Sequence, residues 1–495
     1  MKKLGLAIFA YVLIFGALAI WRWQEWTYGT DTGIFTQAVH TTLTGFINAP
    51  EEGTHFRFHW SPILGVLLPF LSIGRSGLVL QFAQVVLIAA TALPLYGLAS
   101  AYVSSSRAFA YACLALVYPP LCAVAFMEFH EIAFYPVLAL AIMWAADRGR
   151  WRLFGVFAIA GALVREDSCI ILAIVGAVLA LIGFVHRKAS TVEGGGLLVG
   201  QPKQPRRLFI AGLGLTVINL SALFIYFRIV VPSIGPWEPS SHFYEYSFAH
   251  GPAQVVVALI LHPQYIFKLM NLGRLKYLIE ALAPLAFLPL FSRWSLLALP
   301  GLLIVMLAST WIVWHMGSHY PALWAPYFLL GSVAALIRLQ HWTRLYGLSL
   351  VTSAIILVAF NPMRVTYFIR PGYIHADAVR AFDSLPPDAR IVTHYDWLAP
   401  IAFEKPNASV YFCPSTRFAV YDDSYLRDDY PNGYFRDAIR SEIRRELASG
   451  QMHKQAAFGS VTVYLREQGN KIQTTRCNHI GDAKYTTLTA ALSTK

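Results

Sequence analysis

Long apolar runs separated by short polar loops fill the first 360 residues of the chain. A helix that crosses a bilayer needs about 20 apolar residues, within a range of roughly 17–25. Several runs are shorter than that, but we interpret eleven of them as spans: 4–21, 78–103, 108–126, 132–146, 153–165, 168–185, 208–231, 277–292, 294–314, 321–337 and 345–360. The pattern predicts a polytopic α-helical membrane protein.

Basic residues fall in alternate loops between these spans, as the positive-inside rule requires of cytoplasmic loops. If Lys2 and Lys3 lie inside, the inside loops hold these further basic residues: Arg107, Arg148, Arg150, Arg152, Arg187, Lys188, Lys203, Arg206, Arg207, Arg293, Arg338 and Arg344. The run 62–73 is too short to span and contains Pro69, so we expect an interfacial or re-entrant helix there. The alternation places the N-terminus inside and the chain after the last span outside.

The pattern changes after residue 360. Charged helical stretches at 376–385 and 435–448 alternate with short β-like runs at 390–393, 409–412 and 460–465. This alternation is typical of a small α/β domain. We therefore divide the chain into a transmembrane domain, 1–360, whose outside loop 22–77 carries interfacial helices, and a soluble α/β domain, 361–495, on the outer face. The glycine-rich segment 189–205 is expected to be a flexible cytoplasmic linker.

Composition supports a membrane protein and argues against two other classes. The chain is 56% hydrophobic and only 13% charged, and its net charge of +12 is spread over many loops. A nucleic-acid binder would gather that charge on one surface. No nucleotide-binding GxxxxGK[ST] motif is present, which argues against an ATP-driven pump. In the tail, Cys413 and Cys477 could pair in an oxidising compartment.

The first outside loop contains an acidic residue in a helix-start pattern. Thr30 or Asp31 can cap a helix that runs to about Thr44 and lies along the membrane surface. A carboxylate at a helix N-terminus stays ionised, because backbone N–H groups and the helix dipole stabilise its charge. Asp31 is therefore either a cap alone or a group suited to binding or general-base chemistry.

The same loop ends in alternating polar and aromatic residues. If this segment is extended, His55, Arg57 and His59 share one side, where a cation between two imidazoles could receive a phosphate or pyrophosphate. Anchoring at lipid headgroups is the alternative interpretation.

Further polar residues cluster where spans end. Glu128, His130 and Glu131 lie in the second outside turn, and if that turn is helical both carboxylates could face the bundle. Charges at membrane depth are costly, so they are expected to line a cavity and pair with one another. A second charged group, Arg165, Glu166 and Asp167, divides one apolar stretch into two and is expected to be buried and paired in the same way. His315 and His319 have the spacing of a zinc pair but lack the glutamate of HEXXH, so a divalent metal is possible and no metal site is assigned.

Four of these stretches resemble a known family. They are YGTDTGIFT (28–36), HWSPIL (59–64), EFHEIA (128–133) and VRED (164–167). The chain resembles the bacterial and archaeal membrane proteins grouped as domain of unknown function 2079, over roughly residues 10–465. The architecture also resembles the GT-C glycosyltransferases. Departures from the family pattern are Glu128 in place of the usual Asp, the absence of a proline after His130, and Arg165 in place of Lys.

The resemblance implies a membrane glycosyltransferase of the inverting GT-C type in a bacterial or archaeal cytoplasmic membrane. Its donor would be a polyprenyl-phosphate-linked sugar, and its acceptor an unidentified envelope component at the outer face. Asp31, Glu128 and His130 would be catalytic, and the substrate would contact His55, Arg57, His59, Glu131, Arg165, Glu166, Asp167, His315 and His319. Arg57 or Arg165 would hold the donor phosphate. The alternatives are a lipid or solute transporter, which the placement of charges at span ends disfavours, and a non-catalytic envelope scaffold.

Overall fold

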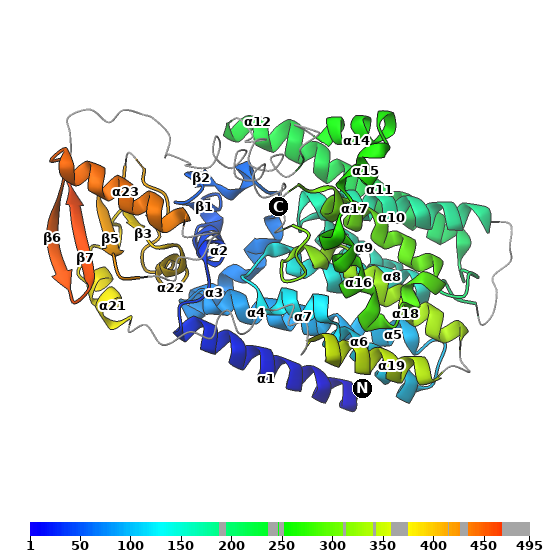
Figure 1. Cartoon of the computed structure of the whole chain (residues 1–495). Helices are drawn as coiled ribbons and strands as arrows, with labels where there is room; N and C mark the ends of the chain where they lie inside the picture. The colour runs from blue at the N-terminus through cyan, green and yellow to red at the C-terminus, as the bar shows by residue number, and fades with distance from the viewer. Residues whose placement is uncertain are drawn as a thin grey trace.

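A computed structural model describes residues 1–187, 195–235, 246, 252–309, 313–339, 343–357, 375–413, 415–425 and 434–467. Figure 1 shows a large helical part joined to a smaller domain built on a β-sheet. The helical part contains these α-helices: α1 (Lys2–Gln24), α2 (Thr30–His40), α3 (Leu68–Gly74), α4 (Leu78–Ala90), α5 (Ala92–Ala99), α6 (Ser105–Val117), α7 (Pro119–Phe126), α8 (Tyr135–Arg148), α9 (Trp151–Ala162), α10 (Glu166–Val185), α11 (Pro205–Ile225), α12 (Val231–Ile234), α14 (Pro252–Leu261), α15 (Gln264–Leu269), α16 (Leu272–Leu282), α17 (Leu299–Leu307), α18 (Ala325–Arg338) and α19 (Thr343–Ile355).

Four helical segments of the described chain are long and apolar enough to cross a membrane. They are Lys2–Gln24, Leu78–Ala99, Glu166–Val185 and Pro205–Ile234. The pair α6 and α7, bent by 51° at Tyr118, would make a fifth. Several shorter apolar helices surround them. The protein is therefore a mostly helical membrane protein, and the count of eleven spans stays a prediction.

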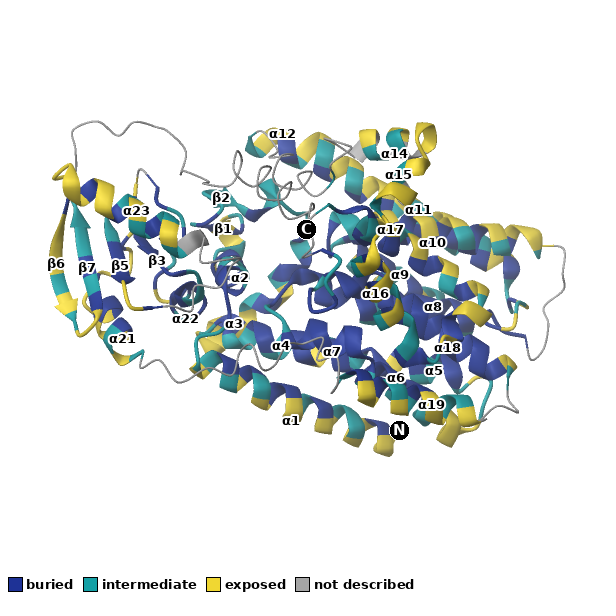
Figure 2. Ribbon diagram, in the orientation of Figure 1, coloured by how far each residue is buried: buried dark blue, intermediate teal, exposed yellow. Residues whose placement is uncertain are grey.

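The outward faces of the long helices are apolar. Leu6, Phe9 and Leu13 on α1 are more than half exposed, as are Val217 and Phe224 on α11. Figure 2 shows exposed positions along the outer sides of α1, α10 and α11, whereas α18 is buried almost throughout. Apolar surface of this extent is unfavourable in water and suits contact with lipid chains.

Two predicted spans are not continuous helices. In the run 277–292, α16 ends at Leu282, and short 3-10 segments follow, Ala283–Leu285 and Leu288–Phe291. Pro284 and Pro289 supply no backbone N–H for a continuing helix, and Ala286 and Phe287 adopt positive φ between the segments. In the run 294–314, a 3-10 segment, Arg293–Ala298, leads into α17, which ends at Leu307. Apolarity alone did not reveal these interruptions.

The run 62–73 forms a short helix, as expected: a 3-10 segment, Pro62–Leu67, is followed by α3. Two other parts of the helical domain differ from expectation. The described part of the predicted linker is packed rather than loose, because Leu197 and Leu198 are buried and the Leu197 N–H donates to the Asp147 carboxylate at 2.8 Å. Residues 188–194 lie outside the described residues. Helices α14 and α15 occupy a stretch for which the sequence predicted no helix.

The smaller domain has a five-stranded sheet in the order β4-β3-β5-β7-β6. Strand β3 is parallel to β4 and β5, and β7 is antiparallel to β5 and β6. The strands are β3 (Ile391–Thr393), β4 (Ala408–Ser409), β5 (Phe418–Asp422), β6 (Met452–Phe458) and β7 (Val461–Arg466), and the helices are α21 (Ala376–Asp383), α22 (Leu398–Ile401) and α23 (Tyr434–Ala448). The sequence predicted both longer helices and three of these strands but not β5 or β6. Cys477 lies outside the described residues, so its pairing with Cys413 remains a prediction.

Helix α2 lies between the two parts of the molecule (Figure 1). Its Gln37 side chain donates to the Ala408 carbonyl oxygen of the sheet domain at 2.9 Å. Gly33 faces Leu398 of α22 so closely that a Cβ there would lie 2.5 Å from Leu398 Cγ. The sheet domain therefore packs directly on the helix that begins at Thr30 and carries Asp31.

Candidate functional site

The N-terminus of α2 is capped from another loop. Gly29 is the N-cap residue and supplies no side chain, and neither Thr30 nor Asp31 caps the helix, so the expected cap is wrong. Instead the Asp31 N–H donates to Glu128 Oε2 at 3.0 Å. The helix also ends earlier than expected, at His40, before a 3-10 turn, Thr42–Thr44. Because the Glu128 carboxylate accepts this N–H at the helix start, the Asp31 carboxylate is available for another contact.

That contact is with His130. Asp31 Oδ2 lies 3.1 Å from His130 Nε2, and His130 Nδ1 lies 3.1 Å from the carbonyl oxygen of Glu128. A carbonyl only accepts, so Nδ1 donates, and a donor at Nε2 toward an ionised Asp31 makes the ring an imidazolium. Burial lowers the pKa of His130, but the hydrogen bond and charge of Asp31 outweigh it and leave that pKa raised. The Asp31 side chain is 43% exposed, whereas His130 is 8% exposed.

Glu128 has a different environment from Asp31. Burial, followed by the negative charge of Asp31, raises the pKa of Glu128 to about 7, although His130 and Arg22 act in the opposite direction. Glu128 can therefore hold a proton near neutral pH.

Buried polar residues hold the loop that carries Glu128 and His130. Gln84 of α4 donates to the carbonyl oxygens of Val124, Met127 and Glu128 at 2.8–3.1 Å, and its Oε1 accepts from the His130 N–H at 3.0 Å. The loop is not helical. Glu128 is nevertheless partly buried and Glu131 fully buried, so the predicted inward direction of both carboxylates is observed.

A second group of charges lies beside this loop and is called here the Arg165 cluster: Arg165, Glu131, Glu166 and Asp167. The guanidinium is 3.2 Å from Asp167 Oδ2, 3.6 Å from Glu131 Oε1 and 3.8 Å from Glu166 Oε1. The Glu131 side chain is fully buried and the Arg165 side chain is 7% exposed. The expected pairing of Arg165 with Glu166 and Asp167 is observed, and Arg165 is buried, whereas the two carboxylates are partly exposed. One guanidinium facing three carboxylates leaves an excess of negative charge.

Histidines connect this cluster to the first loop. His59 Nδ1 lies 2.7 Å from Glu166 Oε1, and the backbone N–H of Trp60 donates to Glu166 Oε2 at 2.9 Å. The segment is not extended, because residues His55–Arg57 form a 3-10 turn, so the predicted common side of His55, Arg57 and His59 is wrong. His55 is buried and pairs with Glu51 at 2.9 Å, which raises the pKa of the imidazole against the effect of burial. Glu51 therefore satisfies Nδ1 of His55, whereas Nε2 is buried and has no hydrogen-bond partner among the described residues.

His319 joins the two groups. Its ring stacks on His130 with centroids 3.6 Å apart and planes at 22°. Burial lowers the pKa of His319 well below its usual value, and the charges of His130, Arg165 and His59 act in the same direction. A neutral imidazole therefore separates the His130 cation from Arg165. Its Nε2 is buried and has no hydrogen-bond partner among the described residues.

Two more of the sequence-predicted residues make contacts within their own loops. Arg57 is half-buried, with its guanidinium near Gly53. His315 Nδ1 accepts from the Gly317 N–H at 3.0 Å within its own turn. Within the described ranges, no group of three or more His, Cys, Asp or Glu side chains is placed to hold a metal ion.

Sequence reasoning missed several residues that build the site. Gln84 and Gln81 lie three positions apart in an otherwise apolar run, and that spacing was a usable signal. No comparable pattern in the sequence pointed to Glu51. Tyr395 comes from the sheet domain: a Cβ on Gly29 would overlap its ring and lie 2.6 Å from Glu128 Oε1. The sheet domain therefore borders the site directly.

Comparisons with known proteins give a family and a distant structural likeness. The oligosaccharyltransferase of Archaeoglobus fulgidus in its apo form has a TM-score of 0.41 and 12% identity, and the match covers 84% of this chain and 69% of that chain. The archaeal oligosaccharyltransferase AglB from the same organism, in complex with an inhibitory peptide and a dolichol-phosphate, has a TM-score of 0.40, 12% identity and the same coverage. TM-scores this low do not establish a common fold. No curated protein matches the chain. The family described as predicted membrane protein (DUF2079) matches residues 21–436, and the chain belongs to that family.

Proposed function

We propose that this protein is a membrane glycosyltransferase that transfers a sugar from a polyprenyl-phosphate-linked donor to an envelope acceptor at the outer face. The observation that carries the proposal is the Asp31–His130 pair, a partly exposed carboxylate held 3.1 Å from an imidazole at the end of a bundle of apolar helices. A lipid-linked donor presents its phosphate at that level of a membrane, so the reacting bond would lie beside the pair.

The chemistry assigned to Asp31 is that of a general base. The acceptor hydroxyl gives its proton to Asp31, its oxygen bonds to the anomeric carbon, and the bond from that carbon to the phosphate oxygen breaks. The polyprenyl phosphate leaves with the bonding electrons. His130 orients Asp31, and its positive charge lies where negative charge develops on the leaving phosphate. Loss of a positioned general base costs about 10²–10⁴ in rate.

The other residues support substrate binding in this proposal. The Arg165 cluster, with His59, would form the polar wall of the cavity. Arg165 already faces three carboxylates, so it can take a donor phosphate only by loosening one of these pairs. Arg57 would serve the same phosphate from the first loop. His55, His315 and His319 would shape the wall.

The proposal includes a topology. We assign a GT-C-like transmembrane domain with about eleven spans, from the apolar runs, and an N-terminus inside, from the basic loops. The sheet domain would then lie outside, in a bacterial or archaeal cytoplasmic membrane. Its contact with α2, through Gln37 and Ala408, supports placing the domain and Asp31 on one face.

The test is the Asp31→Asn variant, compared with wild type for thermal stability and donor binding in detergent and for sugar transfer in membranes. Asparagine keeps the shape but cannot accept the proton, so transfer should fall by about 10²–10⁴ while stability and donor binding change little. Arg57→Ala should mainly weaken donor binding, because it loses a charge-assisted contact worth about 1.5–3 kcal/mol. Arg165→Ala should weaken donor binding and also lower stability, because three carboxylates lose their buried partner.

Two results would contradict the proposal. Unchanged transfer per folded Asp31→Asn molecule would leave the residue with a structural role alone. Absence of binding across a panel of polyprenyl-phosphate sugars would remove the glycosyltransferase assignment itself.

A further inference from the structure

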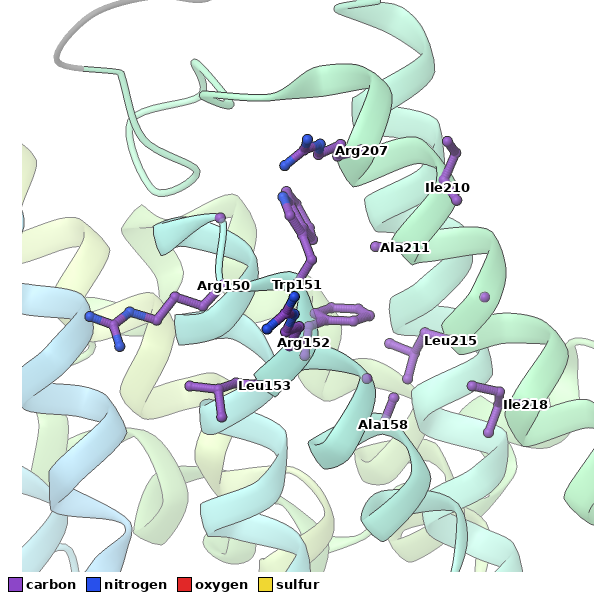
Figure 3. A pocket seen from close by; sticks show the side chains of 14 residues that line it. Arg150, Trp151, Arg152, Leu153, Ala158, Arg207, Ile210, Ala211, Leu215 and Ile218 are labelled. Carbon is purple, nitrogen blue, oxygen red and sulfur yellow. The ribbon is translucent and has the colours of Figure 1, made fainter.

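A groove of about 820 Å³ lies between α9 and α11, far from the Asp31 site. Its mouth carries Arg150, Arg152 and Arg207 beside Trp151, and its floor is apolar, with Ala158, Leu215 and Ile218 (Figure 3). We propose that this groove binds one anionic glycerophospholipid, with its phosphate at the arginines and its acyl chains along the floor.

Position supports a lipid as the occupant. Helices α9 and α11 both begin at the mouth, at Trp151 and Pro205, whereas α10 runs in the opposite direction between them and begins at Glu166. The 20 residues of α10 rise about 30 Å, which is the thickness of a bilayer's hydrocarbon core. The mouth therefore lies at the opposite membrane interface from the Arg165 cluster.

The depth of the groove matches one leaflet of a bilayer. Along α11 the groove extends from Arg207 to Ile218, a rise of about 16 Å at 1.5 Å per residue. That is close to half of the hydrocarbon core. A polyprenyl-phosphate donor whose phosphate sat at this mouth would be a full membrane thickness from Asp31, which disfavours the donor as occupant.

Charge and space fit such a lipid. Arg152 and Arg207 are exposed, whereas Arg150 stacks on Trp144 at 5.3 Å and points away from the other two (Figure 3). The Trp151 Nε1–H donates to Gln204 Oε1 at 2.7 Å, and the Arg207 guanidinium donates to the same oxygen at 3.4 Å, so the mouth is held in place. The unpaired N–H groups at two helix N-termini add to the attraction for a phosphate. Gly155 and Gly214 line the floor, and a Cβ on either would meet nothing within 4 Å.

The test measures lipid adducts of the purified full chain by native mass spectrometry, with phosphatidylglycerol and phosphatidylcholine as probes. Wild type should retain phosphatidylglycerol preferentially. The double variant Arg152→Gln/Arg207→Gln should bind it about 30-fold more weakly, because two basic residues that attract an anionic headgroup at the membrane surface are lost. The matched control is Arg187→Gln/Arg344→Gln, which removes two basic loop residues outside the groove and should bind as wild type does.

Gly214→Leu fills the floor without removing charge and should also lower phosphatidylglycerol retention, which separates groove binding from general attraction to basic loops. Wild type treated with a photoactivatable phosphatidylglycerol should be cross-linked on α9 or α11, and this result decides the question even if a variant fails to fold. Equal retention of the two probes, equal loss in the control, cross-links confined to other helices, or displacement by polyprenyl phosphate would each overturn the proposal.

Discussion

Two carboxylates share the N-terminus of α2, and the protein gives them different environments. Glu128 accepts the Asp31 N–H and has its pKa raised to about 7 by burial and by the charge of Asp31. Asp31 is more exposed and pairs with His130. A cap needs only a hydrogen-bond acceptor, so either protonation state of Glu128 can fill that role. The catalytic assignment therefore belongs to Asp31, whose carboxylate is not occupied by the helix end.

The first residue-scale prediction concerns pH. The pKa of Glu128 in the folded protein lies above its ordinary value of 4.5, so the protonated form stabilises the fold. This contribution is complete below about pH 4.5 and is lost as the pH rises through about 7. Glu128→Gln keeps the acceptor and does not titrate. The stability of wild type relative to Glu128→Gln should therefore fall between pH 5 and pH 8, by on the order of 1–3 kcal/mol.

The measurement is thermal or denaturant unfolding of both proteins across that pH range in one detergent. A stability difference that is flat with pH, or that rises with pH, would show that Glu128 is ionised throughout.

The second residue-scale prediction concerns Gly29. A methyl group there would overlap the Tyr395 ring and approach Glu128 Oε1 to 2.6 Å. Because Tyr395 belongs to the sheet domain and Glu128 to the α2 cap, Gly29→Ala should disturb both and cost about 1–3 kcal/mol. Gly5→Ala is the matched control, since nothing lies within 4 Å of a Cβ at that position. Unfolding free energies for both variants test this, and equal values would refute it.

At the scale of elements, α4 organises the loop that carries Glu128 and His130. Gln84 is fully buried and satisfies three carbonyl oxygens and one N–H of residues 124–130. Without it these groups would lose this partner, at about 1–3 kcal/mol for each group left unsatisfied, although the Glu128 carbonyl oxygen would keep its contact with His130 Nδ1. The loop that carries Glu128 and His130 therefore depends on a residue of the neighbouring helix.

The corresponding prediction is that Gln84→Leu lowers the unfolding free energy by about 2–4 kcal/mol and reduces transfer further by displacing His130. Val86→Leu, at a half-exposed position of the same helix, should change neither. The His130 ring reports the displacement directly: its NMR-monitored titration should move toward the usual imidazole pKa in Gln84→Leu. A titration unchanged from wild type would mean that the loop keeps its shape without Gln84.

Elements marked by local pattern could be predicted, and those set by distant partners could not. The start of α10 at Arg165-Glu166 and the helices at 376–383 and 434–448 follow from polar breaks and amphipathic spacing. The 3-10 turn at His55 was missed, because Glu166 positions the neighbouring His59 from 107 residues away. The pairing of His55 with Glu51, four residues earlier, is local but left no periodic signal in the sequence. The cap of α2 was missed for the same reason, since Glu128 comes from another loop. The sequence supplied the members of the site, and long-range pairing decides their roles.

At the scale of the whole molecule, the sheet domain closes one side of the site. Trp26, just after α1, stacks on His375 at 4.3 Å and meets Trp397 edge-on at 6.1 Å. His40 and Arg75 both contact the Phe403 ring. Contacts with aromatic rings at or just after the C-terminal ends of α1, α2 and α3 thus join the helical part to the sheet domain, around the helix that carries Asp31. An acceptor that reaches Asp31 would pass along this junction.

The last prediction tests the side of the membrane on which this junction lies. Basic loops predict that the sheet domain is outside, and its packing on α2 requires the Asp31 site to face the same compartment. Asp423 is an exposed residue of that domain, and Ser106 is an exposed residue in the Arg107 loop, expected inside. In spheroplasts, a membrane-impermeant thiol reagent should label Asp423→Cys without permeabilisation and Ser106→Cys only after it. Wild type gives the background from native cysteines, of which Cys122 and Cys169 are buried.

The reverse labelling pattern would mean that the sheet domain and the Asp31 site face the cytoplasm, so that the donor would have to bind from the inner leaflet. Labelling of both sites in intact spheroplasts would mean that the two residues lie on one face, which an odd number of spans between them forbids.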